Sequence, residues 1–280
     1  MGSDSALRGA ESLLVIGAGR MGGAIVSGWV SAGLAAQQIH VIDHSVSAVE
    51  ALVETLGVNG YTALEQIAPE LRFSTVLVAL KPQIIADVLP HYTHLIAPKA
   101  QLLSIAAGTT VGQFKALLPE GVAVTRIMPN TPLLVSKGVI AAYSCEMSTQ
   151  AQCAYTQALF SDLGTFHWLS SEQQLHAVTA ISGSGPAYLF YFAECFTAAA
   201  EKLDLPPALG RELALQTLAG ASCLMEQDHR DVSELRREVT SPNGTTAAAI
   251  EQLSAQAQLH QLLGRTLGAA RDRSIALAQE

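Results

Sequence analysis

The feature that most constrains the fold is a short apolar run that leads directly into a glycine-rich turn. Residues 13–16 (Leu-Leu-Val-Ile) precede residues 17–22 (Gly-Ala-Gly-Arg-Met-Gly), and an apolar helical stretch follows. In this pattern Gly17 permits a tight turn, Gly19 lets the backbone approach a pyrophosphate, and Gly22 lets the helix pack closely on the strand. The helix N-terminus adds free N–H groups and positive potential. Strand, turn and helix together predict a nucleotide-binding unit rather than a glycine turn without a ligand.

The first 168 residues alternate short apolar runs with helical stretches, which is the pattern of βαβ units that build a parallel sheet. The runs are too short for typical helices, and several are followed by Gly, Pro or Asp. Strands are expected at residues 13–16, 40–42, 76–80, 102–106, 123–128 and 139–143. Because ligands of such sheets gather at the carboxyl ends of the strands, the turns after these runs are the candidate nucleotide contacts.

The pattern changes after Trp168, because residues 172–280 carry apolar side chains at helical spacing almost throughout. Breaks are expected at residues 182–186, 205–207 and 241–244. Two of the helices, over residues 187–202 and 211–225, carry apolar or small residues on more than one face, as buried helices do. A core shared by two subunits explains this, and the alternative is a monomer whose two domains pack on each other. We expect an all-α dimerisation domain over residues 169–280.

Charge and composition argue against several other classes of protein. The chain has 16 Lys and Arg against 24 Asp and Glu, a formal net charge of −8, whereas nucleic-acid binding needs a basic face. No cationic start precedes an apolar run at the N-terminus, and no window offers about twenty uninterrupted apolar residues. The eight histidines and four cysteines lack metal-ligand spacing. We expect a cytoplasmic protein without a metal, a nucleic-acid partner or a membrane partner.

The four cysteines lie in Ala- and Leu-rich surroundings, and we expect them to be reduced core residues. They are Cys145, Cys153, Cys195 and Cys223.

Asp43 follows the second expected strand, about twenty residues past the glycine motif. An acidic side chain at this position accepts from both ribose hydroxyls and repels a 2′-phosphate, so Asp43 favours NADH over NADPH. Arg20 and the turn at His44 stand close enough in sequence to offset that repulsion. The alternative is that Asp43 is a helix N-terminal cap, since Ser45 and Ser47 stand nearby.

Two segments of the helical part are rich in small and hydroxyl residues, at 182–186 (Ser-Gly-Ser-Gly-Pro) and 240–246 (Thr-Ser-Pro-Asn-Gly-Thr-Thr). The second segment runs into a helical stretch, so its hydroxyls and free N–H groups face whatever docks at the helix start. This arrangement suits a small carboxylate. The alternative is helix capping by Thr245 or Thr246, although one hydroxyl is enough for a cap and the alanines that follow complete no capping box.

At these residues the chain closely resembles the pyrroline-5-carboxylate reductase family, over residues 13–278. The matching segments are 15–21, 79–82, 104–108, 128–132, 180–188 and 240–246, of which 182–186 and 241–246 are the most specific. The resemblance implies an α/β Rossmann-like domain, here over residues 1–168, followed by a helical domain that is interleaved with that of a second subunit, often within a ring of dimers. It also implies an oxidoreductase of proline biosynthesis, which reduces the cyclic imine 1-pyrroline-5-carboxylate to L-proline with NADPH or NADH.

The resemblance also implies the site residues. On the nucleotide side they are Ile16, Gly17, Ala18, Gly19, Arg20, Met21, Ala79, Leu80, Lys81, Pro82, Ile105, Ala106, Ala107 and, near the nicotinamide, Asn130. On the substrate side they are Glu172, Ser241, Gly244, Thr245 and Thr246. Lys81 and Pro82 have an alternative as surface turn residues, since Pro82 fits the first turn of a helix.

Two positions depart from the family pattern. Asp43 stands where members that use NADPH commonly carry a small hydroxyl residue. His229 stands where an acidic residue is expected in several members.

The residue types agree with imine reduction. No segment places a His, Lys or Tyr beside the small-residue segments as a strong general acid, which a carbonyl reduction needs. A cyclic imine binds already protonated, so the protein must mainly hold it against the nicotinamide. We expect Thr246 to act as the catalytic residue by orienting the ring nitrogen, while the amides around residues 244–246 hold the carboxylate.

Two other functions fit the sequence less well than imine reduction. A β-hydroxyacid dehydrogenase would need a lysine of the helical domain at the nicotinamide, and Lys202, the only lysine after residue 168, has the surroundings of a helix-end charge. A nucleotide sensor without catalysis would need no second site, and the segment at 241–246 argues against it.

Overall fold

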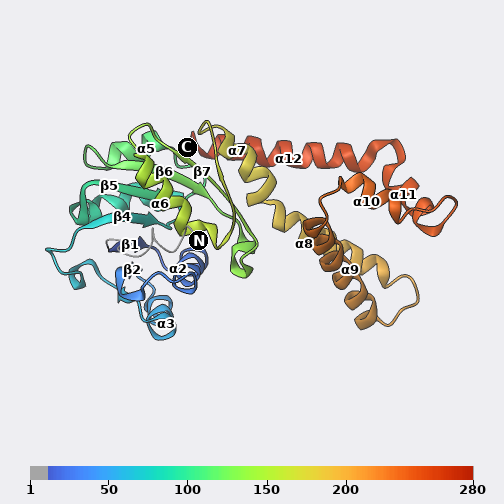
Figure 1. Cartoon of the computed structure of the whole chain (residues 1–280), viewed down its shortest axis with the longest axis horizontal. Coiled ribbons are helices and arrows are strands. Elements are labelled where there is room, and N and C mark those ends of the chain that lie inside the picture. Colours follow the sequence, from blue (N-terminus) through green and yellow to red (C-terminus); the bar gives the residue numbers. More distant parts are fainter. Residues whose placement is uncertain (1–11, 280) are drawn as a thin grey trace. The chain divides into compact units, whose positions relative to one another are not determined.

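The computed structural model describes residues 12–279, which form two compact units (Figure 1). The first unit contains the chain up to Ser184 together with the segment that begins at Ala270. The second unit is Gly185–Ala269. None of the helices in the described range has the length and hydropathy of a membrane span.

A single sheet organises the first unit, and its strand order is β3-β2-β1-β4-β5-β6-β7-β8. All neighbouring strands pair in parallel except β6 and β7, which are antiparallel. The strands are β1 Leu13–Ile16, β2 Ile39–Ile42, β3 Asn59–Tyr61, β4 Phe73–Val78, β5 Ile96–Ser104, β6 Ala123–Met128, β7 Gly138–Ser144 and β8 Gly164–Trp168. The order of the first six is that of dinucleotide-binding sheets, so the expected α/β Rossmann-like class is confirmed.

The six expected strands are all present, and β1 and β6 have the expected bounds. The edge strands β3 and β8 were not expected. β3 is three residues long and contains a glycine, and the edge strand β8 alternates exposed with half-buried side chains. Neither strand has the continuous apolar run on which the expectation rested.

The helices of the first unit cover both faces of the sheet, because successive strand residues point to opposite sides. Leu13 and Val15 pack with Trp29 and Phe160 in one core, whereas Leu14 and Ile16 pack in the other core. The helices are α2 Arg20–Ser31, α3 Val46–Leu56, α4 Pro82–Val88, α5 Val111–Leu117, α6 Gln150–Ser161 and α7 Gln174–Val178, with shorter turns η1 Ala36–Gln38, η2 Leu64–Gln66, η3 Leu89–Leu95, η4 Thr131–Val135 and η5 Thr179–Gly183.

The second unit is helical, as expected. Its elements are α8 Gly185–Ala200, α9 Pro207–Gln227, α10 Val232–Glu238, α11 Thr245–Ser254, η6 Ala255–Ala257 and the larger part of α12 Gln258–Leu277. Little of it is buried in one chain: α8 has no buried residue, and α9 buries only Gly210 and Ala214. Leu189, Phe190 and Tyr191 are 66%, 69% and 67% exposed.

The cysteine expectation is correct in one respect and wrong in another. All four cysteines are free, and Cys145 is buried. Cys195 and Cys223 are exposed, so they are not core residues of a single chain. Cys195 lies on α8 and Cys223 on α9, and the apolar faces of these two helices are uncovered in a single chain.

The break expected at residues 182–186 is confined to Ser184, because η5 extends to Gly183 and α8 begins at Gly185. The turn η5 is π-helical, and Ser184 N donates to the Thr179 carbonyl five residues earlier, at 2.8 Å. A proline has no N–H, so Pro186 cannot donate to the Ser182 carbonyl as an α-helix would require. A π-turn takes up the extra residue at such an interruption.

The two compact units divide at different places from the expected boundary at residues 168 and 169. The sheet does end at Trp168, yet α7, η5 and the end of α12 lie in the first unit. His176 Nδ1 is hydrogen-bonded to Ser274 Oγ at 2.9 Å, and a Cβ on Gly108 would lie 3.3 Å from Leu277 Cβ. The assignment of residues 169–280 as one functional domain stays a prediction.

Candidate functional site

A cavity of about 450 Å³ opens at the carboxyl ends of β1, β4, β5 and β6. Its walls are the glycine-rich turn and the turns that follow the other three strands. The lining residues are Gly19, Arg20, Met21, Gly22, Ala79, Leu80, Lys81, Pro82, Ile105, Ala106, Ala107, Met128, Pro129, Asn130, Thr131 and Gly183. The structure thus brings most of the expected nucleotide contacts to one cavity. Four expected contacts are not among its lining residues, namely Ile16, Gly17, Ala18 and Asp43.

The three motif glycines differ in what requires them. Gly17 has a φ of +111°, and a Cβ there would lie 2.6 Å from the Ala79 carbonyl oxygen. A Cβ on Gly22 would collide with the Gly17 carbonyl oxygen. Gly19 has no protein atom within 4 Å of its Cβ position, although it lines the cavity. No protein contact therefore requires a bare Gly19, and the open backbone fits the close approach of a pyrophosphate.

Asp43 is tied into the protein by both carboxylate oxygens. Oδ2 accepts from Ala18 N at 2.7 Å, and Oδ1 accepts from Ser45 N at 2.8 Å. His44 Nδ1 also lies 3.2 Å from Oδ1, and the Asp43 side chain is only 11% exposed. The capping alternative is wrong, because the N-cap of α3 is Ser45 and Asp43 binds the N–H of that residue rather than one inside the helix. Within residues 12–279, Oδ2 accepts from Ala18 N alone, so its second lone pair leaves capacity for a ribose hydroxyl.

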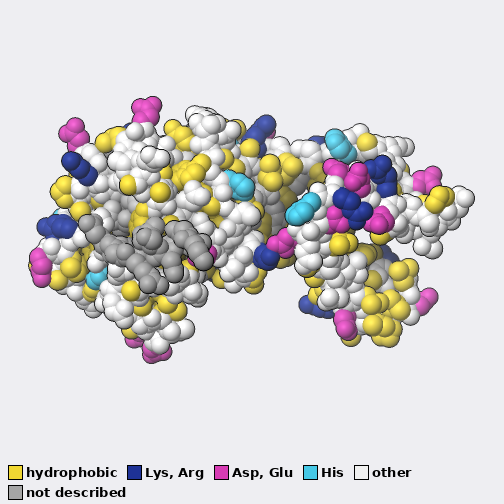
Figure 2. Space-filling view, viewed as in Figure 1, with side chains coloured by type: hydrophobic (Ala, Val, Ile, Leu, Met, Phe, Trp, Pro, Cys, Tyr) yellow, Lys and Arg dark blue, Asp and Glu magenta, His cyan; other side chains and the backbone are white. Residues whose placement is uncertain are grey.

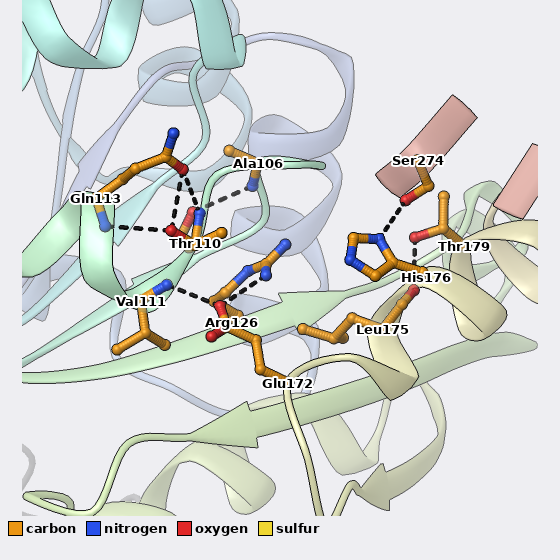
Figure 3. Close-up of polar contacts among 11 residues, drawn as sticks. Ala106, Thr110, Val111, Gln113, Arg126, Glu172, Leu175, His176, Thr179 and Ser274 are labelled. Atoms are coloured by element: carbon orange, nitrogen blue, oxygen red, sulfur yellow. Dashed lines mark hydrogen bonds and ion pairs between the residues drawn. The ribbon is translucent and has the colours of Figure 1, made fainter. Parts of the chain in front are cut away.

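Glu172 joins three elements of the first unit (Figure 3). Its Oε1 accepts from Arg126 Nη1 on β6 and from Val111 N at the start of α5, both at 2.7 Å. The Arg126 side chain is 6% exposed, so Glu172 neutralises a buried guanidinium. This structural role was not visible in the sequence, because the partners are 46 and 61 residues away. A substrate contact of Glu172 stays a prediction.

His176 lies beside this ion pair and faces Ser274 (Figure 3). Burial lowers the pKa of His176, the charge of Arg126 lowers it further, and Glu172 acts in the opposite direction. The neutral imidazole is favoured, so it can share a hydrogen bond with the Ser274 hydroxyl without placing a second cation near Arg126.

The segment at residues 240–246 forms the turn before α11 in the second unit. Asn243 has a φ of +61°, and Gly244 N donates to the Ser241 carbonyl at 3.1 Å. Gly244 is the N-cap of α11 and makes no side-chain cap, and Thr245 and Thr246 are the first two helical residues. The capping alternative for these threonines is therefore wrong. The substrate roles of Ser241, Gly244, Thr245 and Thr246 stay predictions.

Replacing Glu172 with alanine should lower the stability of the first unit. The change leaves the buried Arg126 charge unpaired, and we expect the free energy of unfolding to fall by about 3 kcal/mol. Urea denaturation of Glu172→Ala measures this, with Gln173→Ala as the exposed neighbouring control. Unchanged stability together with a raised KM for the expected imine would contradict the structural role and support a substrate contact.

Comparisons with known proteins agree along the whole chain. A family model described as pyrroline-5-carboxylate reductase dimerisation matches residues 172–277, and one described as NADP oxidoreductase, coenzyme F420-dependent, matches residues 12–108. The pyrroline-5-carboxylate reductase of Pseudomonas aeruginosa is 36% identical, over 95% of this chain and 96% of that protein. The one from Haemophilus influenzae is 34% identical, over 92% and 94%.

Solved structures agree in fold. A pyrroline-5-carboxylate reductase from Coxiella burnetii superposes with a TM-score of 0.88 at 31% identity, covering 96% of this chain and 99% of that one. The Plasmodium falciparum enzyme, solved with NADP bound, gives 0.79 at 25% identity, covering 95% and 99%. With a relative at 36% identity over nearly its full length, the chain belongs to the pyrroline-5-carboxylate reductase family.

Proposed function

We propose that this protein catalyses the NAD(P)H-dependent reduction of 1-pyrroline-5-carboxylate to L-proline, the last step of proline biosynthesis. The observation that carries the proposal is the cavity lined by Gly19 at the carboxyl ends of the strands. The chain that forms this cavity is 36% identical to a named reductase over 95% of its length. The direct test is the consumption of NADH and NADPH with pyrroline-5-carboxylate. A protein that binds NADH but never oxidises it with this imine would contradict the proposal.

The cavity has the features that a dinucleotide requires. The first N–H groups of α2, at Arg20 and Met21, are not used within the helix and are available to a pyrophosphate. Residues 105–107 and 128–131 form the wall beyond the turn, at the end far from Asp43 in the strand order. When bound, the reduced nicotinamide supplies the hydride. The protein's task there is to hold the ring and the imine in register.

The imine is held by positioning groups rather than by a strong acid. We assign the carboxylate to the free N–H groups at the start of α11 and the ring nitrogen to the Thr246 hydroxyl. A protonated imine needs no further activation. Hydride addition to the protonated imine gives an uncharged ring amine, which takes its second proton from solvent.

NADH should be used at least as well as NADPH, because the Asp43 carboxylate favours a free ribose diol and repels a 2′-phosphate. In Asp43→Ser we expect the ratio of kcat/KM for NADPH to that for NADH to rise. The ratio is the proper readout, since losing the Asp43 bonds to Ala18 and Ser45 weakens both cofactors. Asp87→Ser, which removes an exposed acid from α4, is the control. A wild type that strongly prefers NADPH would contradict the ribose assignment and point to Arg20 or His44.

Thr246→Ala should lower turnover while leaving NADH affinity and folding nearly unchanged. Losing an oriented hydrogen bond that is strongest in the transition state costs about 1.4 kcal/mol or more, so kcat/KM for the imine should fall about tenfold or more. Thr245→Ala is the matched control, because the assigned contact of Thr245 is its backbone amide. Kinetics and thermal melts on the same preparations decide the matter. A Thr246→Ala protein that is destabilised but fully active refutes the catalytic role.

The helical unit supports a homodimer, since the dimerisation family model covers residues 172–277. The exposed Leu189, Phe190 and Tyr191 of α8 are the side chains that such an interface would cover. Figure 2 shows hydrophobic side chains at the surface of this unit. We propose further that these dimers assemble into a ring.

Light scattering at micromolar concentration should therefore give at least twice the chain mass of 29.4 kDa. Phe190→Glu should shift the protein toward the monomer, because a charge buried in an interface without a partner is costly. Met147→Glu, at an exposed apolar residue of the first unit, is the control and should leave the mass unchanged. A wild type that runs as a 29.4 kDa monomer would overturn the dimer.

A further inference from the structure

The wall of the cavity that lies farthest from Asp43 is built from two segments that are distant in sequence. Met128 ends β6, Asn130 and Thr131 follow it, and Gly183 comes from the π-helical turn η5. Asp43 follows β2, on the other side of β1 and β4 in the strand order. If Asp43 marks the ribose of the adenosine half, this far wall faces the nicotinamide half. This assignment rests on the proposed function.

Gly183 and Met128 fit together closely in this wall. A Cβ added to Gly183 would lie 2.5 Å from Met128 Cε, a distance at which one of the two must move. The Met128 methyl is the end of a flexible side chain, so a Cβ on Gly183 would push it aside and change the lining of the cavity without a clash with the backbone. The position of η5 therefore sets the shape of this end of the cavity.

The hydroxyls of η5 are turned back on their own helix. Thr179 Oγ1 donates to the Leu175 carbonyl at 2.7 Å, and Ser182 Oγ donates to the Val178 carbonyl at 3.0 Å. The Ser182 carbonyl is different, because Pro186 has no N–H to give it as a helical partner. Its hydrogen bond comes from outside the helix, from Asn130.

Both the nitrogen and the oxygen of the Asn130 side-chain amide form hydrogen bonds within the protein. Nδ2 donates to the Ser182 carbonyl at 3.0 Å, and Oδ1 accepts from Val139 N at the start of β7 at 2.8 Å. The residue is only 6% exposed. One side chain thereby fixes η5 and β7 to the turn after β6.

We infer that Asn130 is a positioning residue, which holds the π-turn in place so that Gly183 and Met128 shape the nicotinamide end of the cavity. It acts through the backbone that it anchors. Pro186 takes part in this arrangement, because it has no N–H to donate to the Ser182 carbonyl and so leaves that oxygen available to Asn130. This role differs from a direct contact between the Asn130 side chain and the cofactor.

Asn130→Asp tests the inference with little change in shape. Aspartate keeps an oxygen for Val139 N but places a second oxygen against the Ser182 carbonyl, so the anchor is replaced by repulsion. We expect affinity for NADH to fall about tenfold, which is the effect of one lost buried hydrogen bond, and kcat to fall with it. Affinity for ADP-ribose, which lacks the nicotinamide, should stay within twofold. The change in NADH fluorescence on binding, which reports the surroundings of the ring, should diminish.

Gly183→Ala disturbs the same wall without touching Asn130 and serves if Asn130→Asp fails to fold. It should show the same selective loss for NADH over ADP-ribose. Adding Met128→Ala to Gly183→Ala makes room for the new Cβ and should recover part of the NADH affinity. Gly112→Ala, at an exposed helical glycine with room for a Cβ, is the control.

Two results would overturn the inference. One is equal loss of NADH and ADP-ribose affinity, which indicates general damage to the cavity. The other is unchanged NADH affinity and fluorescence in both single variants. Because binding is measured without substrate, a wild type that fails to reduce pyrroline-5-carboxylate would refute the proposed function and leave this result intact.

Discussion

The close approach of helix α2 to the sheet is the constraint on which the nucleotide site depends. Gly17 makes the turn with a positive φ, and Gly22 leaves room for the Gly17 carbonyl, so neither tolerates a side chain. Asp43 adds a polar tie, because it accepts from the backbone N–H groups of Ala18 and Ser45. The carboxylate to which we assign cofactor selection therefore also holds the glycine-rich turn. Under this proposal, cofactor choice and turn geometry are coupled through one side chain.

The parts of the fold that the sequence predicts well are those whose residues are buried on both faces. β1 is a continuous apolar run because helices cover both sides of it, so its pattern is independent of what lies beside it in space. The edge strand β8 has no such signature, since its Thr165 and His167 face solvent and only neighbouring β7 makes it a strand. The hydrophobic pattern of a segment says little about its secondary structure where strand pairing, rather than burial, makes the segment a strand.

Part of the candidate site, like part of the fold, can be predicted from local sequence patterns. Strand ends meet at one edge of a parallel sheet, so the turns at Ala79, Ile105 and Asn130 were expected to share a cavity, and they do. Long-range polar pairing was not accessible, because neither the ion pair of Glu172 with Arg126 nor the bond from Asn130 to the Ser182 carbonyl follows from spacing. A serine- and glycine-rich segment that ends in proline has the composition of a loop, whereas all of it except Ser184 is helical, with Asn130 bound to the Ser182 carbonyl.

The apolar side chains of the helical unit are mostly exposed in a single chain. A unit with almost no buried residue in α8 or α9 cannot gain its stability from its own core. Fully burying one large apolar side chain contributes about 1.5–3 kcal/mol, so covering Leu189, Phe190 and Tyr191 in both copies is comparable with the roughly 5–15 kcal/mol that stabilises a typical domain. The fold of this unit and its association are then one equilibrium. Helix α11 also has no buried residue in one chain. The role proposed for Thr246, at the start of α11, would then require the dimer even if the second subunit supplied no catalytic group.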